Sequence, residues 1–405
     1  MSLFLHNAYK ATEVSKQSKR SGIYVLYAGM ILMLILGSIH AFSVFLEPLE
    51  NAFLASRSKV SATYSLALGF LTLSVLFGHH IYSRISPPLL VVFVCILGAT
   101  GCALASIANS LSTVWLGYSL LFGTANGLGY GFALQISAQA NPNWKGLAMG
   151  IITACYALGA VVSPLLFNLL LINYGFAGAM KGLAICLVVV IPICGGLLAV
   201  SKAKLQLSST LEDEDNTSHR MLIIKFWLGY GTAVAAGLIA IGHATGIARA
   251  SGLDDGLVLS APIIIAIFNM VGSLTGGNLA DKIPIRHVLV IFPALSSCVL
   301  FMLAMVDSGL LVLSGLAIIG FSYGAIIAAY PAVVGAFFGS AKGIKIYGRI
   351  FTAWGIAGLL GPVLAGYLYE LSGNYQLTLI VAGCTGLASL ITVWTISSEK
   401  LEELV

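Results

Sequence analysis

The sequence predicts an all-α membrane protein with twelve transmembrane helices in two pseudo-symmetric six-helix bundles. Three observations lead to this fold class. Charged residues make up 9% of the 405 residues, too few to cover a water-soluble fold of this size. Residues 85–144 contain no Asp, Glu, Lys or Arg, whereas one helical bilayer crossing needs about 20 apolar residues. The two halves of the chain also share motifs in the same order.

Other stretches without charge predict the remaining crossings. The predicted spans are residues 22–46, 60–82, 86–108, 112–137, 146–171, 178–200, 221–248, 257–280, 287–306, 308–334, 347–370 and 375–398. The break between the fifth and sixth spans is placed near Asn173–Gly175. The first span is longer than the apolar part of a secretory signal peptide, which is about 7–15 residues, and no small-x-small cleavage site follows it.

The basic residues are distributed unevenly between the two ends of these spans. With both termini cytoplasmic, the outer side holds only Arg57, Lys59, Lys181 and Arg249 of the 20 Lys and Arg residues. This is the positive-inside pattern of an even number of spans. The net charge of +5 then reflects topology and contact with anionic lipid. Nucleic acid is not an expected partner, because no basic patch is interleaved with aromatic residues.

One hydrophilic connection divides the chain. Residues 202–220 carry the acidic run Glu212–Asp215 and separate an N-terminal bundle, residues 1–201, from a C-terminal bundle, residues 221–405. All seven cysteines fall inside predicted spans without the spacing of metal ligands. We interpret them as small buried apolar residues and expect no metal or other cofactor.

The two halves match each other at a shift of about 198 residues. The paired motifs are Ser83-Arg84 with Asp281-Lys282, Gly123-x-x-Asn126-Gly127 with Gly320-x-x-Tyr323-Gly324, Lys145-Gly146 with Lys342-Gly343, Thr153-Ala154 with Thr352-Ala353, and Ser163-Pro164 with Gly361-Pro362. Bundles repeated around a central axis are typical of transporters in which the substrate binds at mid-membrane between halves that rock.

With these motifs the whole chain resembles the major facilitator superfamily. The superfamily's loop motif is similar to Gly277-Asn278-Leu279-Ala280-Asp281-Lys282-Ile283-Pro284-Ile285-Arg286, although Pro284 and Ile285 depart from it. In the first-half copy Ser83 stands where the superfamily has an aspartate. The resemblance implies a conformational latch, for which we expect the residues Arg84, Asp281, Lys282, Arg286 and Arg349. Arg349 has two open interpretations, a snorkelling or latch residue and a substrate contact.

Within the superfamily the chain resembles the oxalate/formate antiporter and bacterial monocarboxylate transporter group. The motifs that carry this resemblance are residues 36–45, 126–131, 241–244 and 347–355. Oxalate exchangers have an Arg and a Lys where this chain has Ser273 and Trp354. A dianion would lack counter-charges in a low-dielectric cavity, so oxalate exchange is disfavoured.

The expected binding site is polar but almost without charge. No carboxylate lies near the middle of a predicted span, so any coupling proton is expected on the substrate or on one of two histidines, His40 and His243. Both histidines have the open alternative of a neutral packing role. The resemblance places the first, fourth, seventh and tenth spans around the cavity. The full predicted substrate-binding set is His40, Tyr118, Asn126, Tyr130, Tyr156, His243, Asn269, Tyr323, Tyr330 and Trp354.

We therefore expect a secondary active transporter of the bacterial inner membrane, multi-pass and monomeric. Its partners are the lipid bilayer and a small organic solute, a monocarboxylate such as lactate or pyruvate, moved by alternating access with a proton. One alternative is an exporter of an amphiphile, such as a siderophore or drug. The other is a transport-like membrane receptor. An enzyme is not expected, because no catalytic triad, metal cluster or pair of acids occurs in or beside any predicted span.

Overall fold

The twelve predicted crossings are present in the fold. The computed structural model describes residues 20–207, 217–258, 260–306 and 308–396, and within these ranges every element is a helix. Ten helices are long and apolar enough to cross a bilayer. One of them, α7 (Lys145–Ser201), makes two crossings, and a further crossing runs from α5 (Leu111–Val114) through η2 (Trp115–Phe122) to α6 (Gly123–Ala140). The predicted fold class is confirmed.

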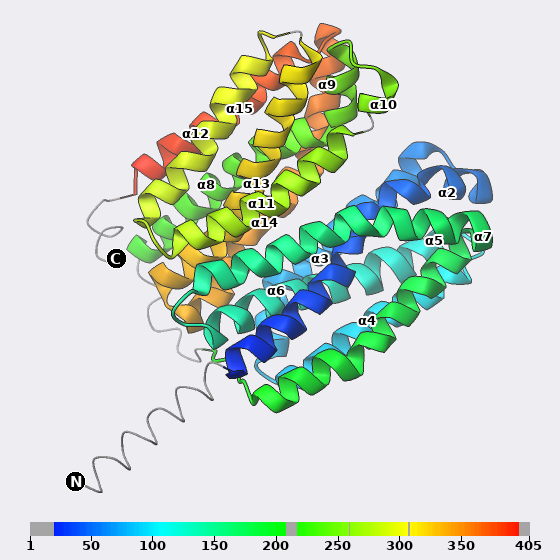
Figure 1. Cartoon of the computed structure of the whole chain (residues 1–405), viewed down its shortest axis with the longest axis vertical. Helices are drawn as coiled ribbons and strands as arrows, with labels where there is room; N and C mark the ends of the chain where they lie inside the picture. The colour runs from blue at the N-terminus through cyan, green and yellow to red at the C-terminus, as the bar shows by residue number, and fades with distance from the viewer. Residues whose placement is uncertain (1–19, 208–216, 259, 307, 397–405) are drawn as a thin grey trace, which may run out of the picture.

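The two bundles lie side by side (Figure 1). The N-terminal bundle begins with the span Arg20–Phe53, which contains η1 (Gly37–Phe45) and α2 (Leu46–Phe53), and continues with α3 (Arg57–Tyr82), α4 (Pro87–Ser106), α5, η2, α6 and α7. The C-terminal bundle consists of α8 (Thr217–Gly242), α9 (Ala244–Ala250), α10 (Asp255–Val258), α11 (Ala261–Ala280), α12 (Ile285–Leu303), α13 (Gly309–Phe338), α14 (Ser340–Ser372) and α15 (Gln376–Trp394). The division at residues 202–220 stays a prediction, because residues 208–216 lie outside the described ranges.

The break between the fifth and sixth spans falls where it was predicted. Gly175 has φ 65° and ψ −171°, a backbone conformation essentially confined to glycine. Helix ends differ more from the prediction: the first span continues to Phe53, and α14 begins at Ser340 instead of residue 347. Hydropathy marks only the apolar middle of a span, whereas the helix continues into the interface, where charged side chains reach water.

The bundles meet along two helix pairs, α7 with α11 and α3 with α14. The internal repeat relates these pairs, because it maps the fifth span onto the eleventh and the second onto the eighth. The close approaches lie near the end that carries the α6–α7 and α11–α12 connections and most basic residues, which we call the cationic end. There a Cβ on Gly277 would lie 2.3 Å from the Gly146 oxygen, and one on Gly348 would lie 2.8 Å from the Val75 oxygen.

The bundles therefore pack backbone against backbone at the cationic end. Toward the opposite end, where α2 and α10 lie, the two groups of helices diverge in Figure 1. The middle of the bundle interface therefore lies between a closely packed end and an end at which the helices diverge.

Glycine packing also holds each bundle together, and Gly272→Ala tests it. A Cβ at Gly272 would lie 1.9 Å from the Phe321 oxygen between α11 and α13. We expect a loss of about 1–3 kcal/mol in stability, seen as a lower melting temperature of the purified protein. The matched control is Gly195→Ala, since nothing lies within 4 Å of that Cβ. Equal melting temperatures for the two variants would contradict this packing.

Candidate functional site

Asp281 joins the two bundles at the cationic end. Its Oδ1 accepts a hydrogen bond from the Gly146 amide at 2.7 Å, and its Oδ2 accepts one from the Leu147 amide at 2.8 Å. These are amides that the start of α7 leaves unpaired, and the helix dipole favours a negative charge there. The counterpart in the first half, Ser83, donates instead to the His80 oxygen of its own segment at 2.9 Å. The seal is therefore asymmetric.

The other expected latch residues lie near the same end. Arg84 and Lys282 are exposed. The Arg286 guanidinium lies 4.9 Å from the ring centre of Trp394 in its own bundle. Arg349 is half-buried on α14. Their part in a latch stays a prediction.

The first span changes its winding beside the middle of the interface. Its η1 segment is a 3₁₀ helix, and such a change interrupts the regular i→i−4 ladder. Two side chains of the fourth span bind carbonyls of this region. Asn126 Nδ2 donates to the Leu36 oxygen at 2.6 Å, and the Tyr118 hydroxyl donates to the Ile39 oxygen at 3.3 Å. Both side chains are fully buried.

His40 lies on η1 within a cluster of polar aromatic residues. Its Nδ1 is 2.7 Å from the hydroxyl of Tyr64 on α3. Its ring meets the Tyr156 ring edge-on, with ring centres 5.2 Å apart. The Tyr156 hydroxyl in turn donates to Asn126 Oδ1 at 2.7 Å. Among the described residues no hydrogen bond involves the Nε2 atom of His40. We call His40, Tyr64, Asn126 and Tyr156 the His40 cluster.

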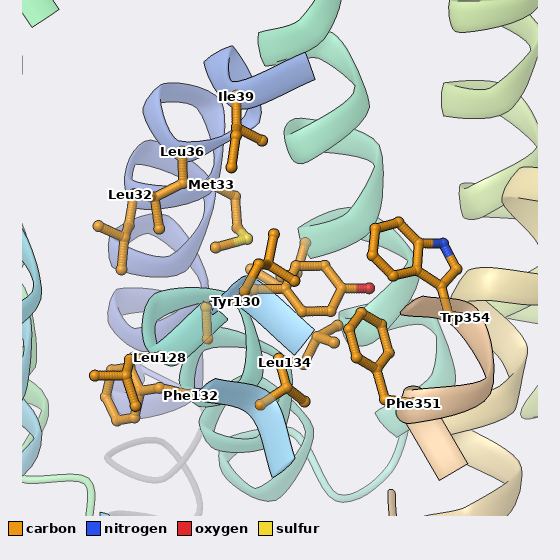
Figure 2. Packing of buried hydrophobic residues seen from close by; sticks show 14 of the residues in the cluster. Leu32, Met33, Leu36, Ile39, Leu128, Tyr130, Phe132, Leu134, Phe351 and Trp354 are labelled. Atoms are coloured by element: carbon orange, nitrogen blue, oxygen red, sulfur yellow. The ribbon is translucent and has the colours of Figure 1, made fainter. Parts of the chain in front are cut away.

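The C-terminal bundle adds a second aromatic group. Trp354 Nε1 donates to the Tyr323 hydroxyl at 2.8 Å, and the Trp354 ring stacks on Phe351 at 5.0 Å. Figure 2 shows the ring of Tyr130 extending from α6 toward Phe351 and Trp354. The ring centres of Tyr130 and Phe351 are 5.6 Å apart, and those of Tyr130 and Tyr156 are 5.2 Å apart. Tyr130 thus links the His40 cluster to the other bundle.

Tyr323 faces the same region from α13. Its partner Trp354 stacks on Phe351, whose ring centre lies 5.6 Å from that of Tyr130 in the N-terminal bundle. The Tyr323 hydroxyl accepts a hydrogen bond from Trp354 and still has its own proton to donate. The structure thus brings residues of the two bundles together around one point.

Three other predicted residues lie apart from this point. Asn269 packs against α13 and its Oδ1 is 3.4 Å from the Ser273 hydroxyl. The Tyr330 ring packs against Tyr230 at a tilt of 40°, with ring centres 4.5 Å apart, and its hydroxyl lies 3.0 Å from the Cβ position of Gly229, within the C-terminal bundle.

His243 lies at the break between α8 and α9, nearer the opposite end. Its Nε2 is 3.0 Å from the Pro362 oxygen and its Nδ1 is 3.2 Å from the Tyr375 hydroxyl. A carbonyl only accepts, so Nε2–H donates to Pro362, and the Tyr375 hydroxyl, which can donate or accept, partners Nδ1. Both ring nitrogens are engaged within one bundle.

Sequence reasoning missed Tyr64, Phe351, Tyr230 and Tyr347. Tyr64 lies on the second span, and no motif marks it. Phe351 and Tyr347 belong to the motif 347–355. Membership of a motif does not show which side chains face the other bundle. The spacing of Tyr347, Phe351 and Trp354 by four and three residues places them on one face of the eleventh span. This spacing was the signal in the sequence that could have identified them.

The described contacts of the His40 cluster, Tyr323 and Trp354 involve no Asp, Glu, Lys or Arg. Within the described residues no group of three or more His, Cys, Asp or Glu side chains is placed to hold a metal ion. The arrangement offers hydroxyls, an amide and a single imidazole. It is suited to bind a small polar solute whose charge, if it has one, is neutralised by a proton.

The chain is similar in sequence to known membrane transporters. The sequence profile of the Major Facilitator Superfamily matches residues 27–343 and, in a second alignment, residues 221–403. Monocarboxylate transporter 13 of Rattus norvegicus is 27% identical over 377 residues, which cover 90% of this chain and 86% of that protein. The oxalate:formate antiporter of Oxalobacter formigenes is 22% identical over 350 residues, or 84% of this chain and 82% of that protein. The aspyridones efflux protein apdF of Emericella nidulans is 25% identical over 368 residues, or 88% and 73%.

Solved structures show the same fold at low sequence identity. The proton:xylose symporter XylE superposes with a TM-score of 0.73 at 14% identity, over 96% of this chain and 99% of that one. FucP in its outward conformation gives a TM-score of 0.67 at 13% identity, over 93% and 99%.

Asp281→Asn tests the seal at the cationic end. The variant replaces two charge-assisted hydrogen bonds with at most one neutral one, which is expected to weaken closure by about 1–2 kcal/mol. Spin labels on the two bundles at this end should then show a larger population of long distances. Glu47→Gln, which removes an exposed carboxylate on α2, is the control. An unchanged distance distribution in Asp281→Asn would show that this contact does not hold the bundles together.

Proposed function

Because the chain belongs to the major facilitator superfamily, we propose that it carries a small monocarboxylate, of the size of lactate or pyruvate, across a membrane together with a proton. The chain is a multi-pass membrane transporter, and the proposal concerns its substrate and coupling. The observation that carries it is the single imidazole of the lining, His40, whose Nε2 atom has no hydrogen-bond partner among the described residues and whose ring contacts Tyr156.

Charge balance supports a singly charged solute. An imidazolium and a carboxylate are each costly in a low-dielectric cavity, and each offsets the other when both are present. One histidine can neutralise one carboxylate, whereas a dianion would keep a net charge. Binding of the anion and of the proton then depend on each other, which is the basis of coupled transport. The Tyr323 hydroxyl, whose proton has no described acceptor, is the neutral group that orients the solute. Tyr156 and Asn126 bind each other and the Leu36 carbonyl, and so fix the surroundings of His40.

The two histidines that the sequence left as alternatives differ in their surroundings. His40 has one ring nitrogen bonded to Tyr64 and the other without a described partner. His243 uses both ring nitrogens for contacts that join α8, α14 and the start of α15. We therefore assign the coupling proton to His40 and a packing role to His243.

The relatives support the same substrate class. One of the similar proteins is named a monocarboxylate transporter and another an oxalate:formate antiporter. Ser273 and Trp354, at positions where oxalate exchangers resembling this group have cations, favour the monocarboxylate over the dicarboxylate.

We further propose the orientation of the molecule from its basic residues. The cationic end faces the cytoplasm together with both chain termini, in the inner membrane of a bacterium, and the protein acts as a monomer. With this orientation the described arrangement, sealed at the cationic end, is the outward-facing one of the two that alternating access requires.

His40→Gln tests the coupling. Losing one partner of a buried ion pair costs about 3–5 kcal/mol, so we expect kcat/KM for lactate near pH 6 to fall by about a hundredfold or more. Uptake by the wild type should rise as the pH falls, because protonation supplies the cation, and uptake by the variant should be nearly independent of pH. Labelled lactate uptake into proteoliposomes measures both.

His243→Gln is the control for this experiment. It breaks two hydrogen bonds within the C-terminal bundle, so we expect a lower melting temperature and an unchanged pH profile. A His40→Gln variant with the pH profile of the wild type would overturn the assignment of the proton to His40.

A second candidate function is export of an amphiphilic compound, such as a siderophore or a drug. The large aromatic surface of Tyr130, Phe351 and Trp354 and the similarity to an efflux protein favour it. Transport assays in right-side-out and inside-out membrane vesicles distinguish the two functions. Extrusion of a fluorescent dye without accumulation of labelled lactate would support the exporter and overturn the monocarboxylate proposal.

A further inference from the structure

Two buried phenols near the His40 cluster have no hydrogen-bond partner. Tyr230 on α8 and Tyr347 on α14 are 0% and 1% exposed. Among the described residues neither hydroxyl completes a hydrogen bond. A buried hydroxyl without a partner is unfavourable, and the great majority of such groups in proteins are paired. These two therefore need an explanation.

Tyr130 belongs to the same group of phenols. The rings of Tyr130 and Tyr347 both contact the Phe351 ring, with ring centres 5.6 Å apart in each case, and Tyr230 lies on α8, which packs against α14. Tyr130 is itself 4% exposed. The three side chains come from α6, α8 and α14, so both bundles contribute to one group of phenols. We call Tyr130, Tyr230 and Tyr347 the tyrosine triad.

Phe351 lies between Tyr347 of the triad and Trp354. Its ring stacks on Trp354, which binds Tyr323, and it also contacts the rings of Tyr130 and Tyr347 at 5.6 Å each. Tyr347 precedes Phe351 by about one turn on α14, and α14 begins at the cationic end. Tyr347 therefore lies on the cationic side of Phe351 and Trp354, and Tyr130 connects the triad to the His40 cluster through Tyr156.

We propose that the tyrosine triad is a second, inner subsite that binds the carboxyl group of the substrate on its way from the His40 site to the cationic end. The inference rests on the proposed function, since it concerns the same substrate. A carboxylate accepts hydrogen bonds at about four lone-pair positions, and each phenol has one O–H to donate. Tyr230 and Tyr347 offer two donors that complete no hydrogen bond among the described residues, beside the hydroxyl of Tyr130. A carboxylate can accept from them, and bonds to an ionised acceptor are the strong ones.

The position of the triad would lower the free-energy barrier that the carboxylate meets on its way to the cationic end. A carboxylate that leaves His40 passes an apolar layer of Phe351 and Trp354, where an unsolvated charge is unfavourable. Donors directly behind this layer lower that barrier. Because the triad is divided between the two bundles, the rocking that opens the cationic end also separates its members and releases the substrate.

The test compares the wild type with the double variant Tyr230→Phe, Tyr347→Phe in proteoliposomes. Phenylalanine keeps the ring and removes only the hydroxyl. We expect the maximal rate of labelled lactate uptake to fall about tenfold or more, as for the loss of hydrogen bonds to a charged group. The dissociation constant of lactate for the purified protein, measured by its thermal stabilisation, should stay unchanged, because the His40 site is intact.

Ser297→Ala is the matched control. Its hydroxyl is also buried and without a described partner, and it faces α15 near Gly386, away from the bundle interface. We expect wild-type uptake from this variant. Stabilisation of the double variant by lactate would show that it is folded and binds substrate.

The outcomes separate the inference from the proposed function. Wild-type uptake rates in a double variant that binds lactate normally would overturn the inner subsite. The triad would then bind a structural water molecule. A parallel loss of affinity would also overturn it, because the hydroxyls would then belong to the His40 site. A wild-type protein that transports no monocarboxylate would overturn the proposed function and this inference with it.

Discussion

A charge in the middle of a membrane protein has to be neutralised where it stands, because water is absent and the surrounding dielectric constant is low. The centre of this molecule meets that condition by having hardly any charge. The carbonyls of the distorted first span are bound by Asn126 and Tyr118, and Asn126 is bound by Tyr156. His40 is the group in this network that can gain a charge, and the proposed linkage between the binding of an anion and of a proton therefore depends on it.

The same constraint keeps the charged residues away from the middle of the membrane. They lie toward the ends of the spans, and one of them, Asp281, binds the start of a helix in the other bundle. The backbone contacts of Gly146 and Gly277 make this approach possible. Because the described hydrogen bond of the Ser83 side chain stays within its own segment, the described seal depends on one side of the repeat more than on the other. A seal held by a few specific contacts can be opened by a modest change in free energy, as rocking bundles require.

Much of the fold followed from the sequence. Hydropathy and the positions of charge gave twelve crossings, and Gly175 marked the reversal inside α7. Helix ends were predicted less well, because the start of α14 carries charged residues that a hydropathy profile excludes.

The site was harder to predict. A spacing along one helix places Asn126 and Tyr130 on one side, but which neighbour each side chain meets depends on how the bundles dock. Tyr64, Tyr230 and Tyr347 became visible only when helices far apart in sequence were brought together. His243 illustrates the converse, since its family motif resembles a functional feature while its two hydrogen bonds lie within one bundle.

The most direct test of charge compensation is the response of lactate uptake to a membrane potential imposed on proteoliposomes at constant pH. If a proton travels with each carboxylate, no net charge moves, and uptake should be the same with and without the potential. Uptake that a positive interior accelerates and a negative interior slows would show that an uncompensated anion crosses the membrane, and would contradict the role given to His40.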